Sequence, residues 1–174
     1  GKKSNYHYML PTPDLIGEAG MYKIGLGLLF GLSDDWRTEA IALANHLSHL
    51  QKKYWQSKFS ISFPRLRPFE GEFSPRAHLS EKELIQLIAA FRICFPDVEL
   101  SLSTRERPDF RDIAVECGIT SMSAGSKTEP GGYSNSEALK QFEIHDERTP
   151  QQVADMIRSK NYEVVWKDWD AVLI

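Results

Sequence analysis

The sequence predicts an α/β fold built on a parallel sheet, and two observations support this prediction. Strand-like apolar runs alternate four times with segments of helical periodicity along the 174 residues, as in chains of βα units. Polar residues gather directly after the strand-like runs, where (βα)8 barrels place their chemistry. Four such units make half of a (βα)8 barrel, although a small open sheet has the same order of elements.

The first unit is a short helix followed by an apolar strand. The helix is predicted to begin with Thr12 as its N-cap and Pro13 at its first position, and to end at Gly20. The run from Tyr22 to Leu29 then predicts a strand. Because this run is nearly continuous in apolar residues, we expect the strand to be buried on both faces.

The second unit joins a long helix to a short strand. The segment from Ser33 to Asp35 caps a helix that is expected to run to about Tyr54. Three- and four-residue spacing predicts its buried stripe. The stripe consists of Ile41, Ala44, Leu47 and Leu50. The run FSISF, from Phe59 to Phe63, is the second strand.

Two further units follow the same order. A capping box at Ser80 and Glu83 starts the next helix. Its apolar positions are Leu84, Leu87, Ile88 and Phe91. The third strand is VELSLS at residues 98–103, a short helix ends at Gly118, and the fourth strand is ITSMS at residues 119–123. A Gly- and Ser-rich loop at residues 125–136 precedes a helix that starts at Thr149, and residues 162–166 predict a final strand.

Charge and composition exclude several classes of function. Lysine and arginine total 21 against 24 acidic residues, so the chain lacks the positive charge that nucleic-acid binding requires. The longest apolar run, about Ile24 to Leu32, is too short to span a bilayer. The first residues contain no secretory signal, and Cys94 and Cys117 are expected to be reduced core thiols. These observations favour a cytoplasmic protein without a membrane or nucleic-acid partner.

Arginines follow the second strand in the motif ISFPRLRP. Arg65 and Arg67 alternate with prolines that stiffen the backbone. A guanidinium group held rigidly at a pocket rim suits bidentate binding of a carboxylate. The alternative is a pair of surface arginines in ordinary ion pairs.

Similar chemistry follows the third strand in the motif LSTRE. Ser103 offers a hydroxyl, whereas Arg105 and Glu106 carry opposite charges and could pair with each other. Because neighbouring strands lie about 5 Å apart, Arg65 and Arg105 are expected to converge on one small anion.

Glycine and serine mark two further segments that a ligand could approach closely. The motif SAGSKTEPGGY begins at Ser123 and includes Ser126 and Lys127, with a plain turn as its alternative. Gly25 and Gly27 lie within the first strand, although their spacing does not match a dinucleotide motif.

These segments together resemble one known family. ISFPRLRP, LSTRE, SAGSKTEPGGY and the terminal VWKDWD occur in the order and spacing of the 2-iminoacetate synthase family. Its members are the tyrosine lyases of thiamine biosynthesis, radical S-adenosylmethionine (radical SAM) enzymes with a biotin and thiamin synthesis associated domain. The run MYKIGLGLLFGL resembles the fifth strand of their barrel.

The resemblance implies a fold, a reaction and partners. The fold would be strands five to eight of a (βα)8 radical SAM barrel over residues 1–135, with a C-terminal helix–strand extension over residues 136–174. The reaction would cleave the Cα–Cβ bond of tyrosine to give 2-iminoacetate and p-cresol, using S-adenosylmethionine and a [4Fe–4S] cluster. The family's cluster motif CxxxCxxC is absent from this sequence. We therefore expect the chain to need the N-terminal half of the barrel and to be inactive alone. The complete enzyme would pass its product, 2-iminoacetate, to thiazole synthase.

Site roles also follow from the resemblance. Arg65 would bind the tyrosine carboxylate, while Ser103 and Arg105 would hold the rest of the amino acid. Arg67 and Glu106 belong to the same predicted substrate site. The predicted S-adenosylmethionine contacts are Gly25, Gly27, Ser123, Ser126 and Lys127.

Three other readings stay open at this point. The related tyrosine lyase of [FeFe]-hydrogenase maturation shares similar arginine motifs. A half barrel has unpaired sheet edges, so the chain could instead be a non-catalytic assembly module that self-associates. The Gly-Ser-Lys loop would also suit phosphate in an aldolase-like barrel half.

Overall fold

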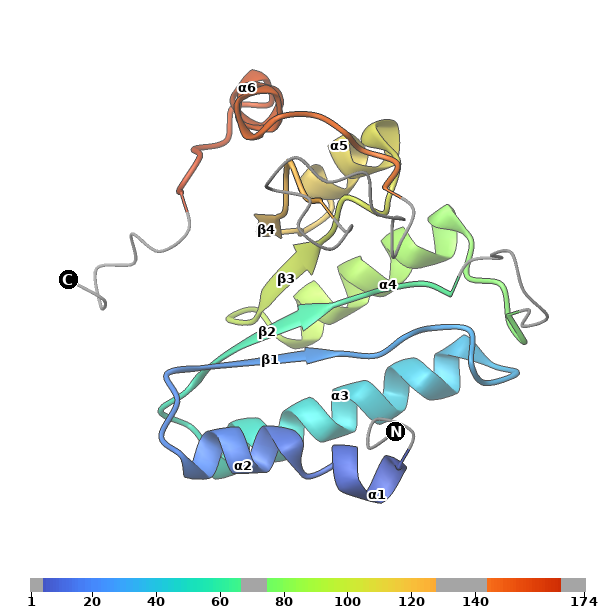
Figure 1. Ribbon diagram of the computed structural model, residues 1–174, viewed down its shortest axis with the longest axis vertical. Helices are drawn as coiled ribbons and strands as arrows, with labels where there is room; N and C mark the ends of the chain where they lie inside the picture. The colour runs from blue at the N-terminus through green and yellow to red at the C-terminus, as the bar shows by residue number, and fades with distance from the viewer. Residues whose placement is uncertain (1–4, 67–74, 128–143, 167–174) are drawn as a thin grey trace. The chain divides into compact units, whose positions relative to one another are not determined.

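The computed structural model describes residues 5–66, 75–127 and 144–166. Its core is a four-stranded sheet with the strand order β1-β2-β3-β4 (Figure 1). The strands are β1 (Lys23–Gly27), β2 (Lys58–Ser62), β3 (Glu99–Leu102) and β4 (Ser121–Met122). Strand β2 pairs in parallel with both β1 and β3. The predicted α/β class and the predicted order of strands are confirmed.

Helices connect the strands as the sequence predicts. The helices are α1 (Tyr6–Met9), α2 (Thr12–Glu18), α3 (Trp36–Lys53), α4 (Glu81–Cys94), α5 (Pro108–Glu116) and α6 (Pro150–Ser159). None of the helices in the described ranges has the length and apolarity to cross a membrane.

The chain forms two compact units, which we describe separately. The first unit contains residues 1–102 and 117–121, and the second contains residues 103–116 and 122–174. The predicted boundary between residues 135 and 136 lies outside the described residues and stays a prediction.

Local capping signals explain where three helices begin. In α3, the Asp35 carboxylate accepts the backbone N–H groups of Arg37 and Thr38. Reciprocal capping boxes start α4 at Ser80 and Glu83 and α6 at Thr149 and Gln152. Each box satisfies backbone donors that the first helical turn leaves without a partner. The predicted box at Ser80 and the predicted caps at Asp35 and Thr149 are confirmed, whereas the part of Gln152 in the α6 box was not predicted.

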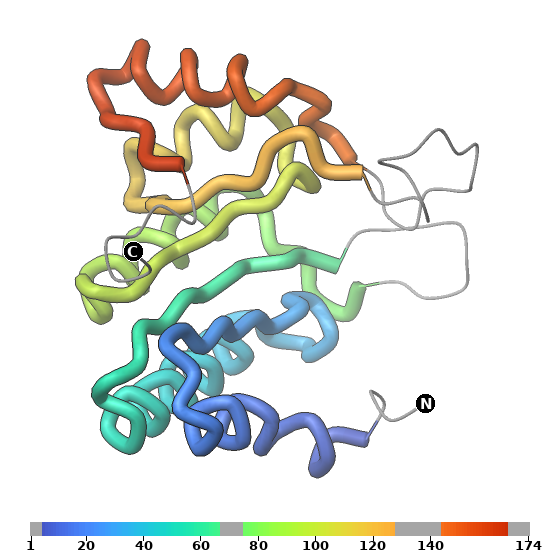
Figure 2. The backbone as a smooth tube through the Cα atoms, turned by 60° about the vertical axis from the view of Figure 1, so that its left-hand side comes forward, coloured from blue at the N-terminus to red at the C-terminus, as the bar shows by residue number. Residues whose placement is uncertain are grey.

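The buried core of the first unit lies between the sheet and helices α3 and α4 (Figure 2). Alternate strand residues are buried on this side, because successive side chains of a strand point to opposite faces. They are Ile24, Leu26, Phe59, Ile61, Leu100 and Leu102. The ring of Phe63, just after β2, packs edge-on against Phe91 of α4, with ring centroids 5.3 Å apart.

The structure corrects two predictions about helices. The N-cap of α2 is Pro11 rather than Thr12, which places Pro13 one position further into the helix. Ile41 of α3 is 62% exposed, so the predicted stripe is wrong at that position. Trp36 in the first turn sets the face that α3 buries, and every third or fourth residue after it lies on that face. This buried stripe continues through Ala40, Leu43, Leu47 and Leu50.

Three further predictions are wrong. Strand β1 buries only one face, because Gly25 and Gly27 occupy the other and are exposed. Residues 162–166 are irregular and form no strand. Cys94 is exposed and Cys117 is half-buried, so neither is a core thiol. Both cysteines lie at helix ends, where the apolar stripe of the helix no longer covers them.

Candidate functional site

The face of the sheet opposite α3 and α4 carries small and polar residues. The register places Gly25 beside Ser60 and Gly27 beside Ser62. A Cβ atom added to Gly27 would lie 2.5 Å from the Ser62 hydroxyl oxygen. The Ser62 hydroxyl therefore lies against the β1 backbone at Gly27, and only glycine fits beside it. This surface, which we call the open face, can admit a ligand close to the main chain.

One ion pair crosses the open face at the beginning of the strands. The Lys23 ammonium group of β1 donates to the Glu99 carboxylate of β3. The register puts Glu99 beside Ser60 of the intervening strand β2. The pair therefore spans three strands at the end of the sheet opposite the predicted site.

Arg65 lies where the chain leaves β2. Phe30 bridges to this segment, since its N–H donates to the Pro64 carbonyl at 2.9 Å and its carbonyl accepts the Leu66 N–H at 2.8 Å. The Arg65 guanidinium donates through Nη1 to the Leu79 carbonyl at 2.7 Å. The exit of β2 is thus tied to the exit of β1, and one guanidinium nitrogen of Arg65 is oriented. Arg67 lies outside the described residues.

Glu39 clamps the loop that follows β1, and the sequence reasoning missed it. The Glu39 carboxylate accepts the backbone N–H groups of Gly31, Leu32 and Ser33 at 3.0, 3.1 and 2.8 Å. The side chain comes from the first turn of α3 and is buried. A glutamate on the buried face of a helix is the signal that could have revealed this clamp.

In the second unit, Ser103 to Glu106 form a turn directly after β3. The Ser103 hydroxyl oxygen accepts the Arg105 N–H at 3.4 Å, and the Ser103 carbonyl accepts the Glu106 N–H at 3.4 Å. Ser103 is exposed and Arg105 half-buried, whereas Glu106 is buried. Both the contact of Glu106 with substrate and its alternative pairing with Arg105 stay predictions.

The segment after β4 lies against this turn. The Ser123 hydroxyl oxygen accepts the Thr104 N–H at 3.2 Å, so residues predicted from two separate motifs are neighbours. Gly125 has a φ of +61° and donates its N–H to the Arg148 carbonyl. Ser126 is half-buried and Lys127 exposed, while the rest of the predicted loop from residue 128 lies outside the described residues.

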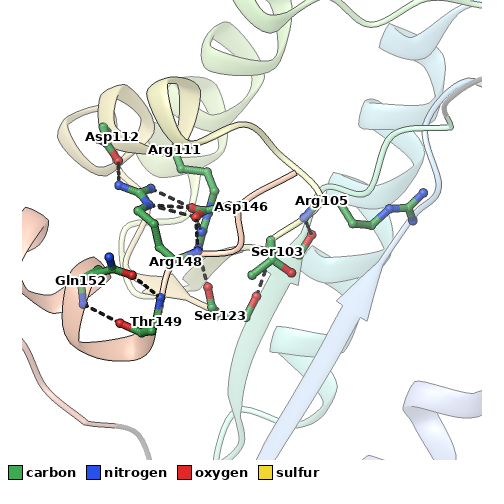
Figure 3. Close-up of polar contacts among 10 residues, drawn as sticks. Ser103, Arg105, Arg111, Asp112, Ser123, Asp146, Arg148, Thr149 and Gln152 are labelled. Carbon is green, nitrogen blue, oxygen red and sulfur yellow. Dashed lines mark hydrogen bonds and ion pairs between the residues drawn. The ribbon is translucent and has the colours of Figure 1, made fainter. Parts of the chain in front are cut away.

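A buried cluster of charges supports both segments. Arg111 of α5 bonds the Asp146 carboxylate and the Ser123 carbonyl, and Arg148 bonds Asp146 and Asp112 (Figure 3). Arg111 and Asp146 are 0% and 1% exposed. The sequence reasoning missed this cluster, although an arginine within the apolar stripe of the short helix was a signal. Figure 3 shows the Arg105 side chain pointing away from it.

The arginines keep Asp146 ionised. Burial alone would raise the pKa of Asp146, but hydrogen bonds from Arg148 and Arg111 outweigh this effect and hold the pKa below its usual value. The hydrogen bonds of Arg148 to Asp146 and Asp112 raise the pKa of Arg148. Both partners therefore stay charged inside the protein.

Acid should destabilise the fold through Asp146. A depressed pKa in the folded state contributes stability above the unfolded pKa of about 3.9, and this contribution is lost as pH falls through the folded value. We expect the free energy of unfolding to fall steeply below about pH 4. Urea denaturation between pH 7 and pH 3 measures it. The double variant Arg111→Met/Asp146→Leu should have a shallower slope, and an equal slope would exclude Asp146 as a source.

Arg65 belongs to the first unit and Arg105 to the second. Their convergence on one ligand therefore stays a prediction. What the structure brings together is the Ser103–Arg105 turn with Ser123 in one unit, and Arg65 with the exit of β1 in the other.

Comparison with sequence models of protein families assigns this chain to a family. The model of the biotin and thiamin synthesis associated domain matches residues 62–163, more than half of the chain. The chain belongs to the biotin and thiamin synthesis associated domain family. In this family member, the matched range includes Arg65, Ser103, Arg105 and the buried charge cluster.

Two curated proteins with similar sequences support a more specific assignment. The 2-iminoacetate synthases of Escherichia coli (strain K12) and Salmonella typhimurium are each 51% identical to this family member over 174 residues. Each alignment covers 99% of this chain and 46% of the relative, so the chain spans about half the length of the curated relatives that it matches. The chain is homologous to the C-terminal part of 2-iminoacetate synthase, which confirms the resemblance.

Solved structures agree with this assignment to the family. The crystal structure of HydG, a maturase of the [FeFe]-hydrogenase, matches with a TM-score of 0.82 and 37% identity, over 93% of this chain and 36% of HydG. HydG from Carboxydothermus hydrogenoformans matches with a TM-score of 0.80 and 32% identity, over 93% of this chain and 37% of that protein. The four-stranded α/β unit therefore corresponds to part of the HydG fold.

Proposed function

We propose that this chain forms strands five to eight of a (βα)8 barrel in a radical SAM tyrosine lyase. The observation that carries the proposal is the open face, which is rich in glycine and serine, on a sheet whose other face is apolar and covered by helices. A barrel strand has one face toward the outer helices and one toward the interior. Residues 136–174 would be the extension that packs on this barrel half.

The substrate in this proposal is tyrosine. Arg65 binds its carboxylate, with Arg67 close by in sequence, while Ser103, Arg105 and Glu106 hold the amino acid at the exit of β3. The reaction cleaves the Cα–Cβ bond and yields 2-iminoacetate and p-cresol, and 2-iminoacetate would pass to thiazole synthase. Support comes from the 51% identity to 2-iminoacetate synthases and from the arginines at two strand exits.

S-adenosylmethionine fits the residues present. Gly25 and Gly27 are exposed beside the hydroxyls of Ser60 and Ser62, where the adenosine group would lie, and Ser123, Ser126 and Lys127 offer polar contacts. When bound, and reduced by one electron from the [4Fe–4S] cluster expected in the N-terminal half, S-adenosylmethionine would supply the 5′-deoxyadenosyl radical that starts the cleavage. The described residues do not fit an iron–sulfur cluster, because no group of three or more His, Cys, Asp or Glu side chains among them is placed to hold a metal ion. We therefore assign no step of the reaction to a cluster in this chain.

Reconstitution tests the proposed lyase. The chain is co-expressed under anaerobic conditions with the N-terminal barrel half of a 2-iminoacetate synthase, and p-cresol formation from tyrosine is measured. We expect p-cresol from the assembly and none from either half alone. An assembly that holds a cluster and S-adenosylmethionine but makes no p-cresol would rule out the proposed activity.

Removing the Arg65 guanidinium should weaken tyrosine binding in the assembly. Arg65→Ala is expected to cost about 1.5–3 kcal/mol of binding free energy, because a charge-assisted hydrogen bond to the carboxylate is lost. Tyrosine titration by calorimetry measures the change. Arg76→Ala is the control, since Arg76 is an exposed arginine of the same unit. Equal affinity in both variants would remove Arg65 from the substrate site.

Two other functions have an observation in their favour. The match to HydG supports the tyrosine lyase of [FeFe]-hydrogenase maturation, although the identity of 37% is lower than the 51% to 2-iminoacetate synthase. The position of β1 at the end of the strand order supports an assembly module that pairs its edge with another copy. Sedimentation of the chain separates the last case, because a stable monomer argues against edge pairing.

A further inference from the structure

Four residues of the second unit form a closed circuit of hydrogen bonds. Arg111 donates to the Ser123 carbonyl and to the Asp146 carboxylate. The Ser123 hydroxyl oxygen accepts the Thr104 N–H at 3.2 Å, and the Thr104 carbonyl accepts the Asp146 N–H at 3.1 Å. The circuit therefore joins α5, the turn after β3, the segment after β4 and the segment before α6.

The circuit holds the backbone next to the predicted ligand contacts. Thr104 lies between Ser103 and Arg105, and the His145 N–H also donates to its carbonyl at 3.1 Å. Ser123 is itself a predicted contact, and Gly125 two residues later is tied to the Arg148 carbonyl at 3.2 Å. Movement of the Arg111–Asp146 pair would therefore shift both strand exits together.

Stability alone does not account for this arrangement. Replacing a buried ion pair by apolar residues of similar volume is often neutral or stabilising, because desolvation offsets the attraction between the charges. Arg111 Nε is also buried without a hydrogen-bond partner in the described part of the chain, and such a donor is destabilising. The guanidinium group nevertheless satisfies two acceptors from different segments, which an apolar side chain cannot do.

We propose that Arg111 and Asp146 are positioning residues that fix the exit of β3 for the amino-acid substrate and, together with it, the exit of β4. The inference rests on the proposed function, which places Ser103 and Arg105 against tyrosine. The pair itself is fully buried, so it acts through the backbone of Thr104 and Ser123 rather than by contact. Displacing a binding group by about 1 Å can reduce the rate of a reaction by about a hundredfold.

The test separates positioning from folding with a charge-free double variant. Arg111→Met/Asp146→Leu removes both charges of the fully buried pair, while Arg148, which is partly exposed, keeps its ion pair with Asp112. The melting temperature should therefore stay close to wild type. In the reconstituted assembly, the KM for tyrosine should nevertheless rise about tenfold or more. If the pair had only a structural role, a double variant with the melting temperature of wild type would also have the KM of wild type.

Two further variants complete the design. Arg111→Lys keeps a positive charge opposite Asp146, but its single nitrogen replaces the two guanidinium nitrogens that reach Asp146 and Ser123. It should raise KM in the same direction, and it decides the question where the double variant does not fold. Glu116→Gln is the matched control, because Glu116 pairs with Lys160 between α5 and α6 on the exposed surface of the same unit. This control should leave KM unchanged.

Hydrogen exchange keeps this inference distinguishable from the proposed function. In the 174-residue chain without ligand, the amides of Thr104, Gly125 and Asp146 should exchange about tenfold faster or more in the double variant than in wild type or Glu116→Gln. If the reconstituted wild-type assembly forms no p-cresol, the lyase proposal is wrong. The exchange rates would still test whether Arg111 and Asp146 hold the two strand exits. Wild-type exchange in a folded variant, or wild-type KM in an active assembly, would overturn that role.

Discussion

Asp146→Asn should lower the free energy of unfolding by about 3–5 kcal/mol. The substitution removes the negative charge that compensates Arg111, and Arg111 is 0% exposed. Burial lowers the pKa of Arg111, but an arginine side chain is not deprotonated in proteins, so Arg111 keeps its charge. The variant therefore buries an unpaired cation, which is among the most destabilising changes a single substitution makes. Urea denaturation at pH 7 measures the loss.

An exposed ion pair of the same unit provides the comparison for Asp146. Lys160→Met breaks the pair with Glu116, whose atoms are 2.7 Å apart at the surface. Solvent and salt screen such a pair, so its loss should cost less than about 1 kcal/mol. Equal losses of unfolding free energy in Asp146→Asn and Lys160→Met would mean that the buried cluster stabilises the fold no more than an exposed ion pair does.

Glu39→Ala should cost about 3 kcal/mol and release the loop after β1. The carboxylate accepts three backbone N–H groups, from Gly31, Leu32 and Ser33. Hydrogen bonds to an ionised acceptor are stronger than neutral ones, and alanine leaves the three donors without this partner. Because Phe30 in the same loop bridges to the Arg65 segment, the release should extend to the exit of β2. Urea denaturation and amide exchange at Gly31 to Ser33 measure the two effects.

Glu18→Ala is the control for Glu39. Glu18 is an exposed glutamate of the same unit, and it accepts a hydrogen bond from Lys53 at 3.4 Å. Its substitution should change the free energy of unfolding by about 0.5 kcal/mol or less. Unchanged exchange at Gly31 to Ser33 in Glu39→Ala would show that the clamp does not hold the loop.

Local patterns carried most of the correct predictions of secondary structure. The capping boxes at Ser80 and Thr149 and the cap at Asp35 lie within a few residues of the donors that they satisfy. Such signals need no information from distant parts of the chain. The run FSISF likewise predicted strand β2, in which Phe59 and Ile61 are buried.

The wrong predictions concern how elements pack. Ile41 fits a helical stripe by spacing, but Trp36 sets a different face toward the core. The apolar run around Gly25 suggested burial on both faces, whereas glycine adds little apolar surface and leaves one face open. In each case several local patterns are compatible with the sequence, and tertiary packing selects among them.

The amino-acid sequence by itself determined the order of the elements from α2 to α6, the starts of α3, α4 and α6, and the kinship with 2-iminoacetate synthases. These properties depend on local spacing or on several motifs in a fixed order. Only the tertiary structure decided that Arg111 meets Asp146, 35 residues further along the chain, and that Glu39 holds the β1 loop. The physical reason is that a charge is stable inside a protein only beside its partner, and the fold, rather than residue spacing, brings these partners together.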